Sequence, residues 1–138
     1  MSAAVADFRP AEYAEYKIKK TADSSDAPTI QLVRNPDILR EVVELRQKTG
    51  TGARLIVGFA AETGSAERTP LELGREKLVR KGCDFLALNT VGVNQGFGTD
   101  DNTITLLSSF TDREPVFSGS KQVVSDQILR TLAQYVKP

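Results

Sequence analysis

The apolar run from Leu55 to Ala60 constrains the fold of this chain more than any other segment. It contains no polar alternation, which is typical of a strand buried on both faces in a parallel sheet covered by helices. The polar residues 62–65 are expected to end this strand. Thr69, Pro70 and Glu72 then predict a helix start, because Thr69 can cap the helix and Glu72 can complete a capping box. The sequence therefore predicts a strand–turn–helix unit.

Two lysines mark one side of the predicted helix. Lys77 and Lys81 lie four residues apart, so they share a face, and Gly82 is expected to end the helix. In open α/β sheets, ligands bind outside the carboxyl ends of the strands. Two ammonium groups beside such a strand suit a phosphate, although a solvated charged face is the more common meaning of this pattern.

The composition excludes several classes of function. Across 138 residues, 18 basic side chains balance 18 acidic ones, so no net charge attracts nucleic acid or an anionic membrane. The apolar runs are too short to span a membrane, no secretory signal pattern is present, and the single cysteine, Cys83, fits a reducing cytoplasm. Histidine is absent, which excludes His-based triads and metal sites. Phosphoryl or nucleotidyl transfer needs no histidine, since positioning and charge neutralisation carry most of that chemistry.

The remaining elements indicate the fold class. Strands are expected over 83–88 and 103–110, with a short antiparallel strand at 115–117. A last helix begins at Ser120 and places four side chains on one face, namely Val124, Ile128, Leu132 and Tyr135. We therefore predict one α/β domain over residues 1–138. Its fold is Rossmann-like with three layers, and its sheet is mostly parallel with an antiparallel extension.

The N-terminal residues are predicted to form a strand end and a hairpin. Residues 1–6 resemble the last part of a buried strand that leads into Asp7, with a turn at Pro10. Residues 13–20 and 29–33 are the arms of a flap over about residues 15–33, with Lys17 on the first arm. A solvated edge strand is the plainer interpretation of this lysine-rich arm.

Asn35 and Pro36 predict the start of another helix, with Asn35 as the cap and Pro36 in the first position. Asp37 suits the positive end of the helix dipole. The apolar stripe of this helix is expected to consist of Ile38, Val42 and Leu45, widened by Leu39 and Val43.

Six motifs in this order and spacing resemble phosphopantothenoylcysteine synthetase, the C-terminal half of the bacterial bifunctional flavoprotein of coenzyme A biosynthesis. The resemblance covers essentially the whole chain. The motifs are Ala3–Arg9, Lys17–Lys20, Asn35–Ile38, Gly58–Thr63, Lys77–Lys81 and Gln95–Phe97.

The resemblance implies a reaction and its participants. Enzymes of this family activate the carboxylate of 4'-phosphopantothenate with CTP, giving an acyl-cytidylate and pyrophosphate, and the amine of cysteine then displaces CMP. The implied cofactor is Mg²⁺ carried by CTP, with no flavin bound by this part and no metal site made by the protein. A homodimer is also implied.

The resemblance further implies which residues act. Lys17 would be the catalytic lysine, stabilising charge that develops during acyl transfer. Lys77 and Lys81 would bind the triphosphate, and Phe59 would pack near the nucleotide. The full set implied to contact CTP is Met1, Ser2, Ala3, Asp7, Lys17, Pro36, Asp37, Ile38, Leu39, Phe59, Lys77 and Lys81.

The sequence also departs from the family pattern. Thr90 stands where the family generally has Asp. The synthetases begin with further strand–helix units, including a glycine-rich turn and an asparagine that contacts the acyl-cytidylate, and neither lies in this sequence. We therefore expect CTP binding without turnover by this chain alone. The alternative is a non-catalytic fragment that serves dimerisation or assembly.

Overall fold

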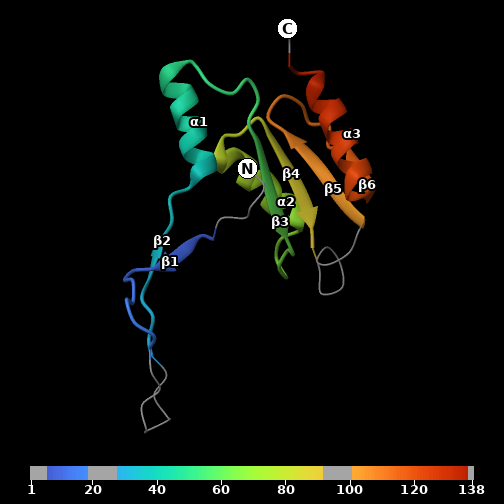
Figure 1. Cartoon of the computed structure of the whole chain (residues 1–138). Helices are drawn as coiled ribbons and strands as arrows, with labels where there is room; N and C mark the ends of the chain where they lie inside the picture. The colour runs from blue at the N-terminus through green and yellow to red at the C-terminus, as the bar shows by residue number, and fades with distance from the viewer. Residues whose placement is uncertain (1–5, 19–27, 92–100, 137–138) are drawn as a thin grey trace. The chain divides into compact units, whose positions relative to one another are not determined.

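The computed structural model describes residues 6–18, 28–91 and 101–136 (Figure 1). The chain divides into two compact units, Met1–Ile38 and Leu39–Pro138, which are described separately below. Within the described ranges, no helix is both long and apolar enough to cross a membrane.

The first unit is built on a two-stranded ribbon. Strand β1 (Phe8–Pro10) pairs antiparallel with β2 (Leu32–Arg34), and the amide of Ala11 donates to the carbonyl of Gln31 at 2.8 Å. The paired residues are therefore 8–10 and 32–34. Residues 13–18 of the predicted first arm are not a strand, and residues 19–27 of the predicted flap lie outside the described residues. The strand predicted before Asp7 falls on residues 1–6, of which 1–5 lie outside the described residues. The turn predicted at Pro10 was wrong, because Pro10 is the last residue of β1. A proline, which has no N–H to donate, is tolerated at the end of so short a ribbon.

The second unit contains a mixed four-stranded sheet in the order β3-β4-β5-β6. Strands β3 (Val57–Glu62) and β4 (Phe85–Thr90) are parallel, with Val57 opposite Phe85. Strands β5 (Asp101–Ser108) and β6 (Val116–Ser120) continue the sheet antiparallel. The α/β class is confirmed, but the prediction of a mostly parallel sheet was wrong: among the described strands only β3 and β4 pair in parallel, and the antiparallel part includes β5 as well as β6. Residues 91–100 are fewer than the dozen or so that a parallel crossover takes, which explains the reversal at β5.

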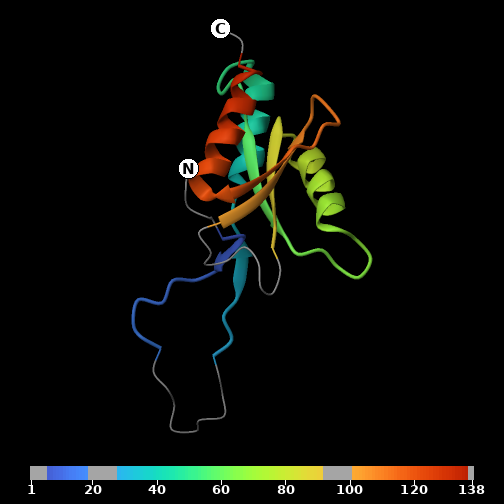
Figure 2. The ribbon, with the colours of Figure 1, turned by 90° about the vertical axis from the view of Figure 1, so that its right-hand side faces the viewer.

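Three helices cover the sheet on both faces. Helices α1 (Ile38–Thr49) and α2 (Pro70–Lys81) lie on one face, and α3 (Lys121–Ala133) lies on the other (Figures 1 and 2). The first face is packed by Val43 of α1 and Leu78 of α2, and the second by Val124 and Ile128 of α3. The predicted three-layer arrangement is confirmed.

Helix α2 has the termini that its sequence predicts. The Thr69 hydroxyl accepts a hydrogen bond from the amide of Glu72 at 3.2 Å, and the Glu72 carboxylate accepts one from the amide of Thr69 at 2.8 Å. At the other end, Gly82 adopts a left-handed conformation with φ 67°, and its amide donates to Leu78. Strand β3 extends two residues further than predicted, so Glu62 is its last residue and does not belong to the turn.

Two predictions about α1 were wrong. The helix begins at Ile38, and Asn35 does not cap it, because its side chain donates to the carbonyl of Ala6 at 2.7 Å and accepts from Arg9 at 3.1 Å. The buried face of α1 also differs from the predicted apolar stripe. Val43 is buried and Leu39 packs against it, whereas Val42 and Leu45 are exposed. The helix lies on the sheet through one narrow face, which Leu39 and Val43 share because they are four residues apart.

Three aromatic rings, those of Phe85, Phe110 and Tyr135, pack together at the core between the sheet and α3. Phe85 meets the ring of Tyr135 edge-on with centroids 5.0 Å apart, and Phe110 stacks on Tyr135 at 5.8 Å. The predicted inward face of α3 is confirmed for Val124, Ile128 and Leu132. Tyr135 lies just beyond the end of this helix and reaches the same core through its ring.

Candidate functional site at the carboxyl end of the parallel strands

The carboxyl ends of β3 and β4 meet at one edge of the sheet, since the two strands are parallel. Glu62 and Thr90, the last residues of these strands, lie opposite each other. The amide of Val91 donates to the carbonyl of Glu62 at 3.0 Å, which holds the two strand ends together. This edge is the place where open α/β sheets bind their ligands.

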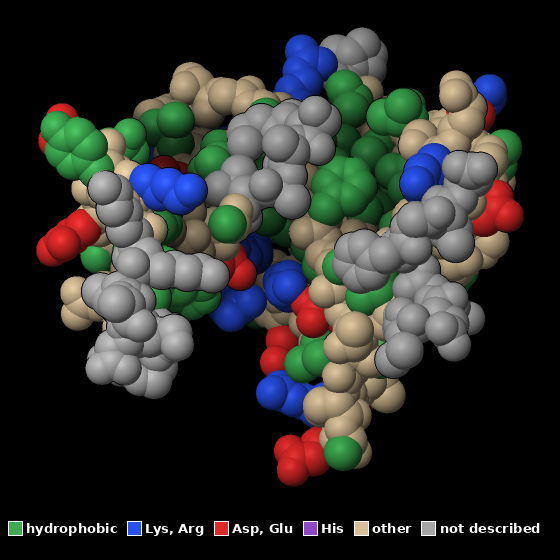
Figure 3. Space-filling view, turned by 60° about the horizontal axis from the view of Figure 1, so that its bottom comes forward, with side chains coloured by type: hydrophobic (Ala, Val, Ile, Leu, Met, Phe, Trp, Pro, Cys, Tyr) green, Lys and Arg blue, Asp and Glu red, His purple; other side chains and the backbone are tan. Residues whose placement is uncertain are grey.

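Lys77 of α2 reaches this edge. Its ammonium forms an ion pair with Oε1 of Glu62. Both side chains are largely withdrawn from solvent, with 27% of Lys77 and 17% of Glu62 exposed. Figure 3 views the molecule from the side toward which β3 and β4 point. The predicted phosphate-binding lysine is therefore at the predicted edge, already in contact with a carboxylate.

Lys81 lies one turn further along α2, on the same partly buried face as Lys77. Its charge acts on Cys83, the buried thiol that follows the helix. Burial raises the pKa of this thiol, while the Lys81 ammonium acts weakly in the opposite direction. The pair of lysines thus shares one face as predicted, but Lys77 is the one in contact with the last residue of β3.

Phe59 lies on the other face of the sheet. Side chains alternate along β3, so Phe59 points to the side of Val57, which packs on the core beneath α3, and away from the side of Ala60 and Glu62. Its ring is 75% exposed. The structure does not bring Phe59 and Lys77 together on one face.

In the first unit, the ribbon brings Asp7 next to the segment that leads into α1. The amide of Asn35 donates to the carbonyl of Asp7 at 2.9 Å, so Asp7, Pro36 and Asp37 are close along the backbone. Ile38 and Leu39 are the first residues of α1. Lys17 is exposed and lies in neither described strand. Met1, Ser2, Ala3 and the motif 95–97 lie outside the described residues.

Glu62 is the site residue that the sequence interpretation missed. It stood among the polar residues 62–65, which were assigned to a turn. The available signal was its position directly after Ala61, at the end of an apolar run, because a carboxylate there needs a cationic partner once the strand is covered.

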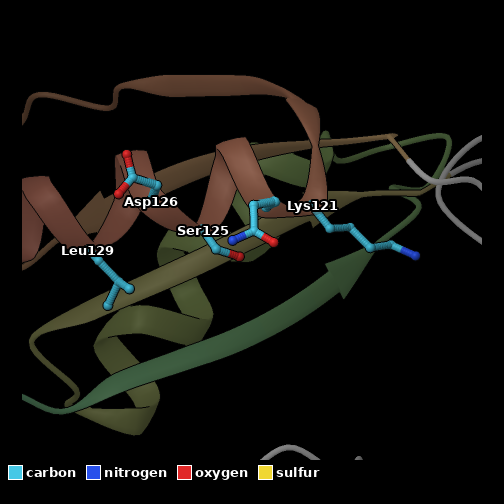
Figure 4. Close-up of a pocket in the computed structure, with 5 residues that line it drawn as sticks. Lys121, Ser125, Asp126 and Leu129 are labelled. Carbon is cyan, nitrogen blue, oxygen red and sulfur yellow. The ribbon is translucent and has the colours of Figure 1, made fainter.

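Other surfaces of the described residues are weaker candidates for a ligand site. No group of three or more acidic or thiol side chains in those ranges could hold a metal ion. A shallow hollow of about 390 Å³ lies along α3, where Ser125 and Leu129 point to one side and Asp126 to the other (Figure 4). Asp126 is bound to Arg130 at 2.7 Å, so its carboxylate is already paired. None of the predicted site residues lines this hollow.

Comparison with known proteins identifies the family. The model of the DNA/pantothenate metabolism flavoprotein C-terminal domain matches residues 1–136. The chain belongs to this family.

Curated relatives agree with this DNA/pantothenate metabolism flavoprotein family. The chain is 46% identical to the coenzyme A biosynthesis bifunctional protein CoaBC of Mycolicibacterium smegmatis, over 99% of the chain and 33% of that protein. It is 44% identical to the CoaBC protein of Vibrio vulnificus, over 94% of the chain and 30% of that protein. The chain thus spans about a third of the length of these relatives. The resemblance predicted from six motifs, to the C-terminal part of the bifunctional coenzyme A biosynthesis proteins, is confirmed.

A solved structure supports the fold. The DNA/pantothenate metabolism flavoprotein from Streptococcus pneumoniae superimposes with a TM-score of 0.62. The match covers 96% of this chain and 57% of that one, at 16% sequence identity. This family member shares the Rossmann-like architecture with the chain described here.

Proposed function

We propose that this chain is the CTP-binding part of a phosphopantothenate–cysteine ligase. The observation that supports the proposal is the position of Lys77, whose ammonium is held at the carboxyl end of β3 in a family of coenzyme A biosynthesis proteins. A cation at this edge of an α/β sheet suits the phosphates of a nucleotide. A cytoplasmic homodimer is part of the same proposal.

The proposed reaction has two steps. A carboxylate oxygen of 4'-phosphopantothenate attacks the α-phosphorus of CTP, forming the acyl-cytidylate as pyrophosphate leaves. The amine of cysteine then attacks the acyl carbon, an amide forms, the amine loses a proton, and CMP leaves.

The residues of this chain would mainly bind and orient the nucleotide. Lys77 and Lys81 would bind the triphosphate, and the segment from Pro36 to Leu39, which leads into α1, would hold the nucleotide near the N-terminus of that helix. Lys17 would stabilise the negative charge that develops during acyl transfer. Such positioning and charge stabilisation supply most of the catalysis in phosphoryl and nucleotidyl transfer.

In this proposal Mg²⁺ is bound by the triphosphate of CTP and enters the site with it. Among the described residues, no carboxylate cluster forms a metal site, and the Glu62 carboxylate is occupied by Lys77. Mg²⁺ commonly binds through substrate phosphates and a few waters, where it neutralises phosphate charge.

Isothermal titration calorimetry of the chain with Mg²⁺ and each of CTP, ATP, GTP and UTP tests the proposal. We expect saturable CTP binding that is tighter than that of the other three. An absence of heat at millimolar CTP would disprove nucleotide binding. Equal affinities for all four would show that only the triphosphate is recognised.

A second candidate function is assembly, and the surface around β3 favours it. In the described ranges β3 pairs only with β4, so its other edge has backbone groups able to pair. The exposed ring of Phe59 and the outward side chains of Val42 and Leu45 add apolar surface in this unit. Light scattering of the chain, with and without CTP, distinguishes the candidates. A stable dimer that binds no CTP would favour assembly alone, and a monomer at high concentration would exclude it.

A further inference from the structure

Glu62 occupies a fixed position at the edge where the phosphates are proposed to bind. Its carbonyl accepts the amide of Val91 at 3.0 Å, and it pairs with Thr90 across the parallel ladder. Its side chain points to the face covered by α1 and α2, as Ala60 does two residues earlier. The carboxylate is therefore placed by the sheet and not by a flexible loop.

The environment of this carboxylate leaves it dependent on Lys77. Oε1 of Glu62 is buried, and among the described groups the Lys77 ammonium is what lies against it, as an ion pair without an aligned hydrogen bond from elsewhere. A buried carboxylate is unfavourable unless a cation compensates it. The ammonium in turn lies mostly out of solvent, so each charge stabilises the other.

The ion pair between Arg68 and Glu76 of α2 differs in this respect. Arg68 and Glu76 bind each other at 2.6 Å, but both side chains are more than half exposed. Such a pair is screened by water and has little effect on distant charges. The Lys77–Glu62 pair is more shielded from water. The negative charge of Glu62 should therefore act on any anion that reaches the Lys77 ammonium.

We propose that Glu62 is a positioning residue that holds Lys77 at the carboxyl edge and neutralises it while the site is empty, and that it thereby limits the affinity for polyphosphate. The assignment of Lys77 to phosphate rests on the proposed function. A lysine ammonium has three donors, so it can contact a phosphate while it remains on Glu62. The phosphate then meets a neutral pair, and it lies close enough to the carboxylate to be repelled by it.

Replacing Glu62 by Gln separates the two effects of the residue. The amide keeps the size of the side chain and one acceptor oxygen for Lys77, but it removes the negative charge. The lysine therefore stays near its position, while the repulsion of an incoming phosphate disappears. We expect Glu62→Gln to bind inorganic tripolyphosphate about tenfold more tightly, which corresponds to about 1.4 kcal/mol.

The experiment is calorimetry of the full 138-residue chain with inorganic tripolyphosphate. The variants are Glu62→Gln, Lys77→Gln, the double variant, and Glu76→Gln as a control that makes the same change in net charge on an exposed pair. We expect the gain in Glu62→Gln only, and the double variant should bind as weakly as Lys77→Gln. A gain of equal size in Glu76→Gln, a gain that survives without Lys77, or weaker binding in Glu62→Gln would overturn the proposal, as would an absence of tripolyphosphate binding in every form.

Circular dichroism of each variant shows whether it is folded. If Glu62→Gln does not fold, Glu62→Asp replaces it, because the shorter side chain keeps the charge and withdraws it from Lys77. This variant should show a smaller gain in tripolyphosphate affinity, and no gain would overturn the proposal.

The same titrations with CTP separate this inference from the proposed function. If tripolyphosphate binding rises in Glu62→Gln while CTP binds no better than tripolyphosphate, the role of Glu62 stands and nucleotide recognition fails. If CTP binds selectively but its affinity is the same in wild type and Glu62→Gln, the proposed function stands and the role of Glu62 fails.

Discussion

Arg46 of α1 clamps Asp84, the residue before β4, through two hydrogen bonds of 2.6 and 2.9 Å. The same carboxylate accepts the amide of Ile56 at 2.7 Å, just before β3 begins. The hydrogen bonds from Arg46 to the Asp84 carboxylate raise the pKa of Arg46. One nearly buried side chain thus joins a helix to both parallel strands, at the opposite end of the sheet from Glu62.

Asp84→Asn should destabilise the second unit by about 2–3 kcal/mol, because breaking a buried pair leaves a charge without its partner and this pair retains some exposure. Urea unfolding followed by circular dichroism measures the change. Asp126→Asn is the control, since it removes an exposed pair on α3 and should change the free energy of unfolding by less than about 0.5 kcal/mol. Equal effects of both substitutions would contradict this role of Asp84.

Lys77→Gln and Lys81→Gln should each weaken CTP binding about tenfold or more, because a charge-assisted contact is worth roughly 1.5–3 kcal/mol. Cytidine, which has no phosphate, should be affected much less. Arg80→Gln is the matched control on the exposed side of α2. Calorimetry with both ligands tests this, and an unchanged CTP affinity in both lysine variants would return these lysines to the role of a solvated charged face.

Gly74→Ala should destabilise α2 although alanine is the better helix former. An added Cβ would lie 2.8 Å from Leu88 and 3.0 Å from Leu107, both of which are buried. Overpacking costs about 1–3 kcal/mol, which exceeds the gain of about 1 kcal/mol in helix propensity. Thermal unfolding measures the difference, and a higher melting temperature would show that the two leucines move aside at little cost.

The capping box predicts a pH dependence of stability. The amide of Thr69 donates to the Glu72 carboxylate and holds its pKa below the ordinary value of 4.5. A lowered pKa in the folded state gives stability that is present above 4.5 and is lost as the pH falls through the folded value. Glu72→Gln should therefore lower the urea midpoint at pH 7 and have less effect at about pH 3. An equal loss at both values would contradict a contribution from the charge.

The chain alone should bind CTP without turning it over. It spans about a third of its curated relatives, and acyl transfer is sensitive to misplacement of its reactants, by about a hundredfold for 1 Å. Pyrophosphate release with CTP, 4'-phosphopantothenate, cysteine and Mg²⁺ is the assay, and Lys17→Gln is the control. Robust release that depends on Lys17 would refute this expectation.

The sequence predicts those elements whose signals are local. Thr69, Glu72 and Gly82 determine the ends of α2 through their own hydrogen bonds, so the helix was found to the residue. The turn residues 111–114 likewise indicate that the chain reverses, and the short antiparallel strand expected at 115–117 is present as β6 beside β5.

The errors arose where partners come from distant parts of the chain. Asn35 has the chemistry of a helix cap, but Ala6 and Arg9 take its side chain, and nothing near Asn35 reveals this. The inward face of α1 depends on which side meets the sheet, so Val43 and not Val42 is buried. The contact of Glu62 with Lys77 joins positions on a strand and a helix, and periodicity within either element cannot show it.

The aromatic cluster makes the two units separately visible by spectroscopy. The chain has no tryptophan and three tyrosines, so fluorescence excited at wavelengths that phenylalanine does not absorb comes from tyrosine alone. Tyr13 and Tyr16 are exposed in the first unit, whereas Tyr135 contacts Phe85 and Phe110 in the core of the second. Tyr135→Phe would therefore remove the tyrosine emission of the second unit and leave that of the first. Tyr13→Phe together with Tyr16→Phe would leave only the emission of the second unit. Each unit can then be followed by its own emission during unfolding or nucleotide binding.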